Sequence, residues 1–166
     1  MLVDRSSFPT IEGARLIGPK MTMNPPQGIY PSDPPECAAL FAPKAIQAVV
    51  GGLTDGRHIA FNVSIELHKE RIDYRNVVGK CGTFKVGNIT NTVTKRSLPG
   101  LPDWAIAIQP ATSPRQEITE LDVLGYHRGV FIESRWRKLP PGDPSQEDIA
   151  SLVKIFNDQV TKLEAV

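Results

Sequence analysis

The sequence has almost no net charge, which limits the partners that electrostatics could select. Nineteen lysine and arginine residues oppose eighteen aspartate and glutamate residues, so the 166-residue chain carries a formal net charge of +1. Binding to nucleic acid or to an anionic membrane surface usually requires a marked positive field. We therefore predict no nucleic-acid partner. A local basic cluster (Arg135, Arg137 and Lys138 beside Trp136) is interpreted as a solvated strand face around a core tryptophan.

Long apolar runs are also absent. No stretch approaches the ~18 residues that are needed to span a bilayer. The first residues, MLVDRSSFPT, have neither the basic region nor the long apolar region of a signal peptide. The hydrophobic content of 40% is nevertheless normal for a globular protein of this length. We expect a single domain over residues 1–166, monomeric and with no transmembrane segment.

The sequence lacks the short motifs that identify common catalytic sites. No G-x-S-x-G nucleophile elbow occurs. The glycine-rich GGLTDG at 51–56 has neither the lysine nor the spacing of a phosphate-binding loop. Two cysteines and three histidines include no close ligand pair of the kind that zinc sites usually show. We predict neither a metal nor another cofactor.

Proline, in contrast, is abundant and marks the connecting segments. The fifteen prolines cluster at 25–35, 99–114 and 140–144. Residues 1–35 are predicted to be a largely irregular lead-in, because PKMTMNPPQGIYPSDPP at 19–35 shows no sustained hydrophobic period. A loop of that length is expected to be functional or held tightly against the surface.

A short helix is predicted directly after this lead-in. Asp33 is the expected N-cap, Pro34 occupies the first helical position, and the helix should end near Phe41, before Pro43. The next residues, KAIQAVV at 44–50, are assigned a further short helical turn that GGLTDG stops.

The C-terminal helix is better defined. Asp143 is the expected N-cap, with Pro144 at the first helical position and Gln146 at the capping-box position. One apolar stripe follows at helical spacing: Ile149, Leu152, Val153, Phe156, Val160 and Leu163. A stripe of this width must pack against another apolar surface.

Alternating segments in the middle of the chain predict that surface. Residues 57–68 alternate most regularly, and 81–88, 91–98 and 103–110 predict further strands. Residues 116–138 predict a hairpin that turns at His127-Arg128-Gly129, and 69–80 show a weak helical spacing. The order of elements predicts an α+β fold, a two-layer α/β sandwich. Its mostly antiparallel sheet of five to six strands is packed by an N-terminal and a long C-terminal helix.

The two cysteines, Cys37 and Cys81, allow three interpretations. A thiol at a helix N-terminus can be an activated nucleophile, but no histidine motif supplies the base that such a site needs. A metal site has only the weak basis described above. The pattern favours a single structural disulfide between a helix start and a strand start, which implies an oxidising compartment.

Carboxylates gather in the predicted hairpin. Glu117, Glu120, Asp122 and Glu133 could supply a glycosidase-like pair. Charges on the solvent face and edge of a sheet are the favoured interpretation. A hydrolase that uses these carboxylates or His127 remains an alternative function.

Several landmarks together resemble a known group of proteins. They are FP at 8–9, PPECAALF at 34–41, VVGKCGTF at 77–84, GYHRGVFIESRW at 125–136 and LVKIFNDQVTKLEA at 152–165. This pattern resembles mycobacterial secreted or lipoprotein envelope domains of unknown function. It is distantly similar to the extracellular sensor domain of a mycobacterial serine/threonine kinase. That sensor domain usually carries four cysteines in two disulfides, whereas this chain has two cysteines, so one bridge would be absent.

The resemblance implies an extracytoplasmic protein, secreted or associated with the cell envelope, with no known catalysis. We expect a binding module that holds an apolar or amphipathic ligand, such as a lipid or glycan, or a partner protein, in a groove between sheet and helices. The residues predicted to line this groove are aromatic side chains and possible anion contacts: Tyr30, Tyr74, Trp104, Tyr126, Trp136, Arg128 and Arg135. A third possibility is a structural or interaction protein that uses the proline-rich 19–35 segment as its contact.

Overall fold

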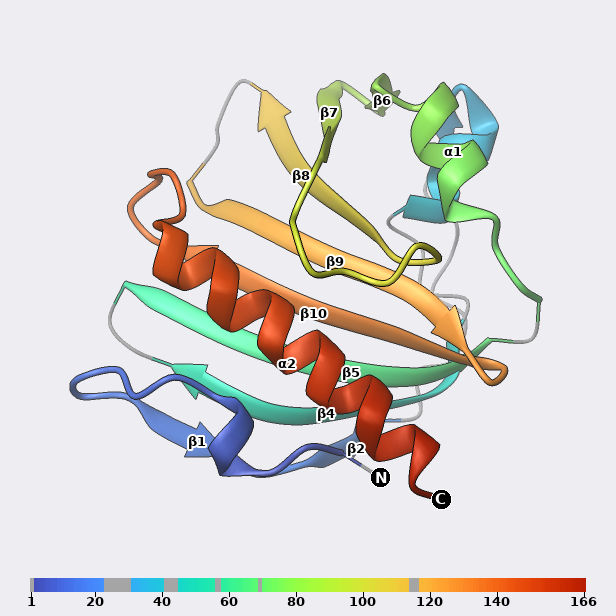
Figure 1. Cartoon of the computed structure of the whole chain (residues 1–166). Coiled ribbons are helices and arrows are strands. Elements are labelled where there is room, and N and C mark those ends of the chain that lie inside the picture. The colour runs from blue at the N-terminus through green and yellow to red at the C-terminus, as the bar shows by residue number, and fades with distance from the viewer. Residues whose placement is uncertain (1, 23–30, 41–44, 56–57, 69, 114–116) are drawn as a thin grey trace.

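The chain folds around one large antiparallel sheet (Figure 1). The computed structural model describes residues 2–22, 31–40, 45–55, 58–68, 70–113 and 117–166. Its strands are β1 (Arg15–Ile17), β2 (Lys20–Thr22), β3 (Ser32–Asp33), β4 (Ala45–Asp55), β5 (Ile59–His68), β6 (Thr83–Val86), β7 (Ile89–Arg96), β8 (Ile106–Ser113), β9 (Thr119–His127) and β10 (Val130–Lys138). The helices are the 3-10 helices η1 (Arg5–Ser7) and η2 (Pro35–Leu40) and the α-helices α1 (Tyr74–Lys80) and α2 (Gln146–Glu164).

The strand order is β1-β4-β5-β10-β9-β8-β7-β6-β3, with β2 also paired to β4. Every strand pair between described residues is antiparallel. The predicted α+β class and the mostly antiparallel sheet are therefore confirmed. Within the described residues the sheet has ten strands, where five to six were expected.

The extra strands come from the first third of the chain. β1, β2 and β3 lie in the lead-in that was predicted to be irregular, and they pair with β4 and β6. β4 replaces the helical turn predicted at 44–50 and continues through the glycines that were expected to stop it. Pairing on both sides of β4 outweighs the weak helical spacing, and its register shifts between Gly51 and Thr54, where glycine accommodates a bulge.

The central hairpin agrees with its prediction. β9 and β10 pair from His127 opposite Val130 to Thr119 opposite Lys138. The two-residue turn places Arg128 at φ 51° and Gly129 at φ 80°. Positive φ at both positions is typical of the turn that matches the right-handed twist of a hairpin.

Helix α2 crosses one face of the sheet and packs mainly on β10. Its N-cap is Ser145 rather than the predicted Asp143, and Ser145 and Asp148 form a reciprocal capping box. The serine accepts from the N3 amide and the aspartate accepts from the Ser145 amide, which satisfies two donors at once. The buried cluster on this face comprises Val3, Phe8, Phe61, Val63, Ala105, Ala107, Leu121, Val123, Ile132, Trp136, Leu152, Ile155, Phe156 and Val160.

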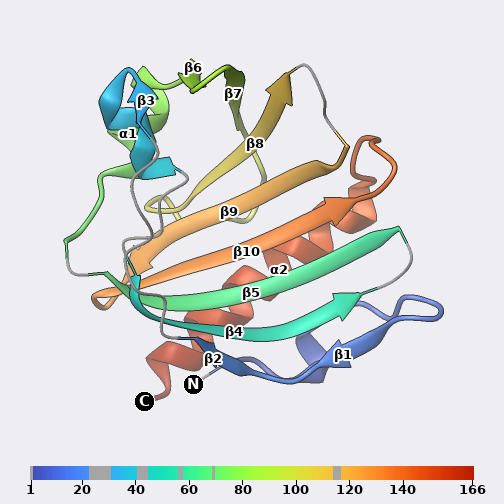
Figure 2. The same cartoon turned by 180° about the vertical axis from the view of Figure 1, so that it is seen from behind.

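A second buried cluster lies on the other face, at one end of the sheet. In β8, Ala107 packs toward α2 whereas Ile106 and Ile108 belong to the second cluster, as the two-residue period of a strand requires. This cluster contains Cys37, Val78, Cys81, Phe84, Val93, Ile106, Ile108, Leu124 and Phe131. Figure 2 shows this face, with η2 and α1 together at the end of the sheet.

Cys37 and Cys81 form the predicted disulfide inside this second cluster. Their sulfur atoms are 2.02 Å apart and both residues are fully buried. Cys37 lies in η2, and Cys81 is the C-cap of α1. Cys81 therefore follows a helix rather than standing at the beginning of a strand, and the bridge joins the two short helices to each other.

Candidate functional site

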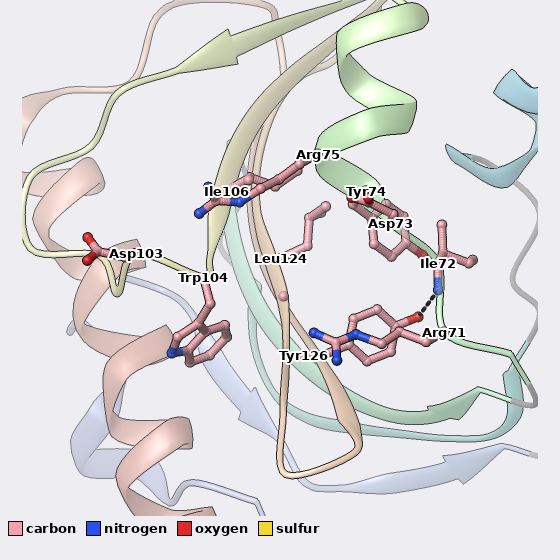
Figure 3. Close-up of a pocket in the computed structure, with 11 residues that line it drawn as sticks. Arg71, Ile72, Asp73, Tyr74, Arg75, Asp103, Trp104, Ile106, Leu124 and Tyr126 are labelled. Atoms are coloured by element: carbon pink, nitrogen blue, oxygen red, sulfur yellow. Dashed lines mark hydrogen bonds between the residues drawn. The ribbon is translucent and has the colours of Figure 1, made fainter.

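A cavity of about 650 Å³ opens beside α1 (Figure 3). It lies between the start of that helix, the segment that precedes β8, and the last residues of β9. Its lining residues are Arg71, Ile72, Asp73, Tyr74, Arg75, Asp103, Trp104, Ile106, Leu124, Gly125 and Tyr126. The volume falls within the range of small-molecule sites in proteins, roughly 300–1,000 Å³.

Aromatic rings form two walls of the cavity. Tyr74 and Tyr126 stack with ring centroids 6.2 Å apart, and Tyr74 also stacks on Phe131 at 5.1 Å. Trp104 faces them from the segment before β8. Burial, followed by the neighbouring Tyr126, Glu133 and Glu66, raises the pKa of the Tyr74 phenol well above its usual value, so this wall is uncharged at physiological pH.

Trp104 occupies its position because residue 125 is glycine. A Cβ atom at Gly125 would lie 2.7 Å from two carbon atoms of the indole ring, which is closer than van der Waals contact allows. The ring also stacks on His127 at 5.3 Å and packs against Phe156 at 5.6 Å. Trp104 thus connects the cavity to the α2 side of the sheet.

A hydrogen-bonded relay fixes the opposite wall. Glu66 Oε2 lies 2.8 Å from His68 Nε2, and His68 Nδ1 lies 2.6 Å from the Tyr126 hydroxyl. The hydroxyl also accepts from the Ile72 backbone N–H at 3.1 Å. With His68 neutral, Nε2–H donates to Glu66, and Nδ1 accepts the Tyr126 proton. Tyr126 therefore ties the start of α1 to β5.

Two arginines border the cavity from the α1 side. The guanidinium carbon of Arg71 lies 5.3 Å from the centroid of the Tyr126 ring, and Arg75 follows four residues later. Both are exposed, and among the described residues no ion pair involves either of them. Two acids border the same space. Asp73 accepts from the Asn76 amide as the N-cap of α1, and Asp103 lies exposed on the Trp104 side.

A separate charged network lies on the same face of the sheet, outside the cavity. Arg135 donates to Asp122 at 2.7 Å and to Glu133 at 2.8 Å, and Arg137 lies 2.6 Å from Glu120. Burial, and then the neighbouring Glu133 and Glu120, raise the pKa of the Asp122 carboxyl to about 7 against the opposing effect of Arg135. Burial also raises the pKa of Glu133.

The structure brings three of the predicted binding residues together and separates the others. Tyr74, Trp104 and Tyr126 line the cavity. Arg128 donates to the Leu163 carbonyl at 3.0 Å near the end of α2, and Arg135 belongs to the charged network. Trp136, at 0% exposure, lies in the core under α2 and is not among the residues that line this cavity, and Tyr30 lies outside the described residues.

Sequence reasoning missed Arg71, Arg75 and His68. The weak helical pattern at 69–80 gave no reason to single out Arg71 and Arg75, and Arg71 lies before the helix rather than on it. Glu66 and His68 alternate on the polar side of a predicted strand, and that alternation is the signal for their contact. Only the fold could show that Tyr126 completes the relay.

The residues of the hydrolase alternative are placed as follows. Glu120, Asp122 and Glu133 meet on the sheet face, each beside an arginine. His127 stacks on Trp104, and its Nε2 lies 3.4 Å from Glu164. Glu117 is exposed before β9. Within the described part of the chain, no group of three or more potential ligands could hold a metal, and no helix is long and apolar enough to cross a membrane.

Comparison with solved structures identifies the fold. An uncharacterised protein from Mycobacterium smegmatis is similar to this chain with a TM-score of 0.55 at 14% identity, covering 94% of this chain and 92% of that one. The extracellular domain of PknH from Mycobacterium tuberculosis is similar with a TM-score of 0.52 at 13% identity, covering 97% and 93%. The resemblance inferred from the sequence landmarks is thereby confirmed at the level of the fold. No family model and no curated protein matches the sequence significantly.

Proposed function

We propose that this chain is a non-catalytic extracytoplasmic binding module, which holds an amphipathic ligand in the cavity beside α1. The observation that carries the proposal is the convergence of Tyr74, Trp104 and Tyr126 on one cavity, from three different parts of the sequence. Aromatic walls with a few polar groups at the rim are typical of ligand sites.

The disulfide and the fold support an extracytoplasmic location. A buried structural disulfide persists in oxidising compartments and is rare in the bacterial cytosol. The fold is shared with the extracellular domain of a kinase, in which the equivalent module lies outside the cell.

Binding is favoured over catalysis by the surroundings of the candidate catalytic groups. Of the four carboxylates of the hydrolase alternative, Glu120, Asp122 and Glu133 are paired with an arginine, and none of the four is among the residues that line the cavity. His127 is a ring partner of Trp104 rather than a group that faces a nucleophile. The alternative that uses the 19–35 segment remains a prediction, because residues 23–30 lie outside the described residues.

The proposal is tested with a neutral apolar dye, N-phenyl-1-naphthylamine, whose fluorescence rises on transfer to an apolar site. We expect saturable binding by the wild type, and at least about fivefold weaker binding by Trp104→Ala, because one aromatic wall is removed. Ile118→Ala is the matched control, since Ile118 is an exposed apolar residue immediately before β9, at the opposite end of that strand from the cavity.

A second variant tests the same site without removing a side chain. Gly125→Ala should displace the Trp104 ring and weaken binding of the dye by a similar factor. Circular dichroism establishes that each variant is folded. Absence of saturable binding by the wild type, or equal binding by Trp104→Ala and Ile118→Ala, would overturn the proposal.

A further inference from the structure

We infer that the ligand of this cavity carries an anionic group, which Arg71 and Arg75 bind at the rim while the aromatic walls hold its apolar body. This inference rests on the proposed function, because it assigns the chemical class of the ligand in the same cavity. The class is an amphipathic molecule with a flat or ring-shaped apolar part and one carboxylate, sulfonate or phosphate.

Arg71 and Arg75 border the cavity from the segment that leads into α1 and from the first turn of that helix. Arg71 lies two residues before the N-cap Asp73, and Arg75 is the second residue of the helix. In Figure 3 the Arg71 side chain extends across the Tyr126 ring toward Trp104, and the Arg75 side chain extends from α1 toward Ile106. Among the described residues neither guanidinium is in an ion pair, so both can donate to a ligand at the rim.

Arg71 is held by a cation–π contact. Its guanidinium carbon lies 5.3 Å from the centroid of the Tyr126 ring. This contact uses none of the N–H donors of the guanidinium, whose fork geometry matches an oxyanion. The Tyr126 ring is itself held by His68 and Ile72, so the platform beneath Arg71 is in place before a ligand arrives.

Other arginines of the sheet and its turns have structural partners. Arg128 donates to carbonyl oxygens at the end of α2, Arg135 donates to Asp122 on β9 and to Glu133 on its own strand, and Arg137 forms an ion pair with Glu120 on β9. Arg71 and Arg75, in contrast, border a cavity with aromatic walls. Of the acids at the rim, Asp73 is committed to capping α1, and Asp103 lies on the opposite side of the cavity.

The test compares two dyes that differ in one charged group. 8-Anilinonaphthalene-1-sulfonate has the ring system of N-phenyl-1-naphthylamine with an added sulfonate, which stays ionised between pH 5 and 8. Dissociation constants of both dyes are measured by fluorescence titration for the wild type and for a variant that combines Arg71→Gln and Arg75→Gln. Glutamine keeps much of the length and polarity of arginine and removes its charge.

We expect the double variant to bind the sulfonate dye about tenfold more weakly and the neutral dye within about twofold of the wild type. Arg15→Gln removes the charge of one arginine on β1, at the far edge of the sheet. It should leave the dissociation constants of both dyes unchanged. Asp103→Asn removes a negative charge from the rim and should leave the sulfonate dye unchanged or tighten its binding.

The outcomes separate the inference from the proposed function. If the wild type binds both dyes and the double variant loses affinity for both equally, or for neither, the inference of an anionic ligand is wrong. The proposed binding cavity is not contradicted by that result. If Arg15→Gln loses as much affinity for the sulfonate dye as the double variant does, the inference is also wrong, because a general charge effect would then explain the result. Failure of both dyes to bind the wild type would overturn the proposed function and the inference with it.

Discussion

The two faces of the sheet are built differently. The face under α2 is covered by one long helix and holds an apolar core, with Trp136, Phe61, Leu152 and Ile155 almost completely buried. The opposite face is covered at one end by a seven-residue α-helix and a six-residue 3-10 helix. There the second cluster surrounds a disulfide, a charged network runs along the strands, and the cavity opens beside α1.

This difference separates the part of the molecule that stabilises the fold from the part proposed to bind. Helices as short as η2 and α1 have little stability of their own, because nucleation is not repaid within so few residues. A covalent bridge between them holds their position without a thick apolar layer. The surface beside them can therefore carry arginines, tyrosines and open volume that a core such as the one under α2 does not admit.

The largest effect is expected from a cavity cut into the α2 core. Leu152→Ala removes a fully buried side chain and should lower the free energy of unfolding by about 4 kcal/mol. Urea unfolding followed by circular dichroism measures it. Lys154→Ala on the exposed side of the same helix should cost about 0.5 kcal/mol or less. A loss in Leu152→Ala as small as in this control would show that α2 is not the main stabilising layer.

Removal of the disulfide should affect both the stability of the protein and binding on the sheet face opposite α2. The bridge closes a sequence separation of 44 residues, so replacing both cysteines with alanine should lower the free energy of unfolding by about 4 kcal/mol, chiefly through the unfolded chain. The folded variant should also bind N-phenyl-1-naphthylamine more weakly, because the bridge fixes α1, one wall of the cavity. Leu152→Ala, studied where it is still folded, should bind the dye like the wild type. The reverse pattern would remove the distinction between the two faces.

The charged network around Asp122 should make the stability of the protein depend on pH. The pKa of Asp122 is about 7 in the folded protein, above the ordinary 3.8 expected for the unfolded chain. The folded state therefore keeps a proton that the unfolded state has released, and the free energy of unfolding falls as pH rises from about 4 through 7.

Asp122→Asn removes this titrating group. Relative to the variant, the wild type should lose about 2–3 kcal/mol of stability between pH 5 and 8. Urea unfolding at both pH values measures the difference. A difference that does not change with pH, or that grows in favour of the wild type at pH 8, would show that Arg135 holds Asp122 ionised throughout.

The smallest effect belongs to the start of α2. Ser145→Ala removes a hydroxyl that accepts from the Asp148 amide at 3.0 Å and should cost about 1 kcal/mol. Asp143→Ala is the matched control, since Asp143 was the N-cap expected from sequence and lies two residues before the observed one. Equal losses in thermal melts of the two variants would contradict the assigned cap.

The regular parts of the fold could be predicted because their signals are local. The apolar stripe from Ile149 to Leu163 is sufficient to predict α2, and the alternation at 57–68 is sufficient to predict β5. A short turn around Gly129 predicts the hairpin. β4 could not be predicted in this way. Its short helical spacing and two glycines are overruled by hydrogen bonds to β5 on one side and to β1 and β2, from the lead-in of the chain, on the other.

The candidate site could be predicted only in part, for the same reason. Tyr74, Trp104 and Tyr126 were chosen as aromatic candidates, but nothing local shows that they share a cavity while Trp136 lies in the core. The alternation of β10 places Trp136 with Ile132 toward α2, so attention to strand phase would have separated it. Arg71, Arg75 and the contact between His68 and Tyr126 depend on the packing of α1 against the sheet.

The location of the ligand is tested most directly by amide hydrogen exchange, resolved by residue, with and without 8-anilinonaphthalene-1-sulfonate. We predict that the dye increases protection at residues 71–75, 103–106 and 124–126. The Ile72 amide, which donates to Tyr126, should respond strongly. Protection along α2, residues 146–164, should stay unchanged. Increased protection along α2 without a change at 71–75 would contradict the assignment of binding to this end of the sheet.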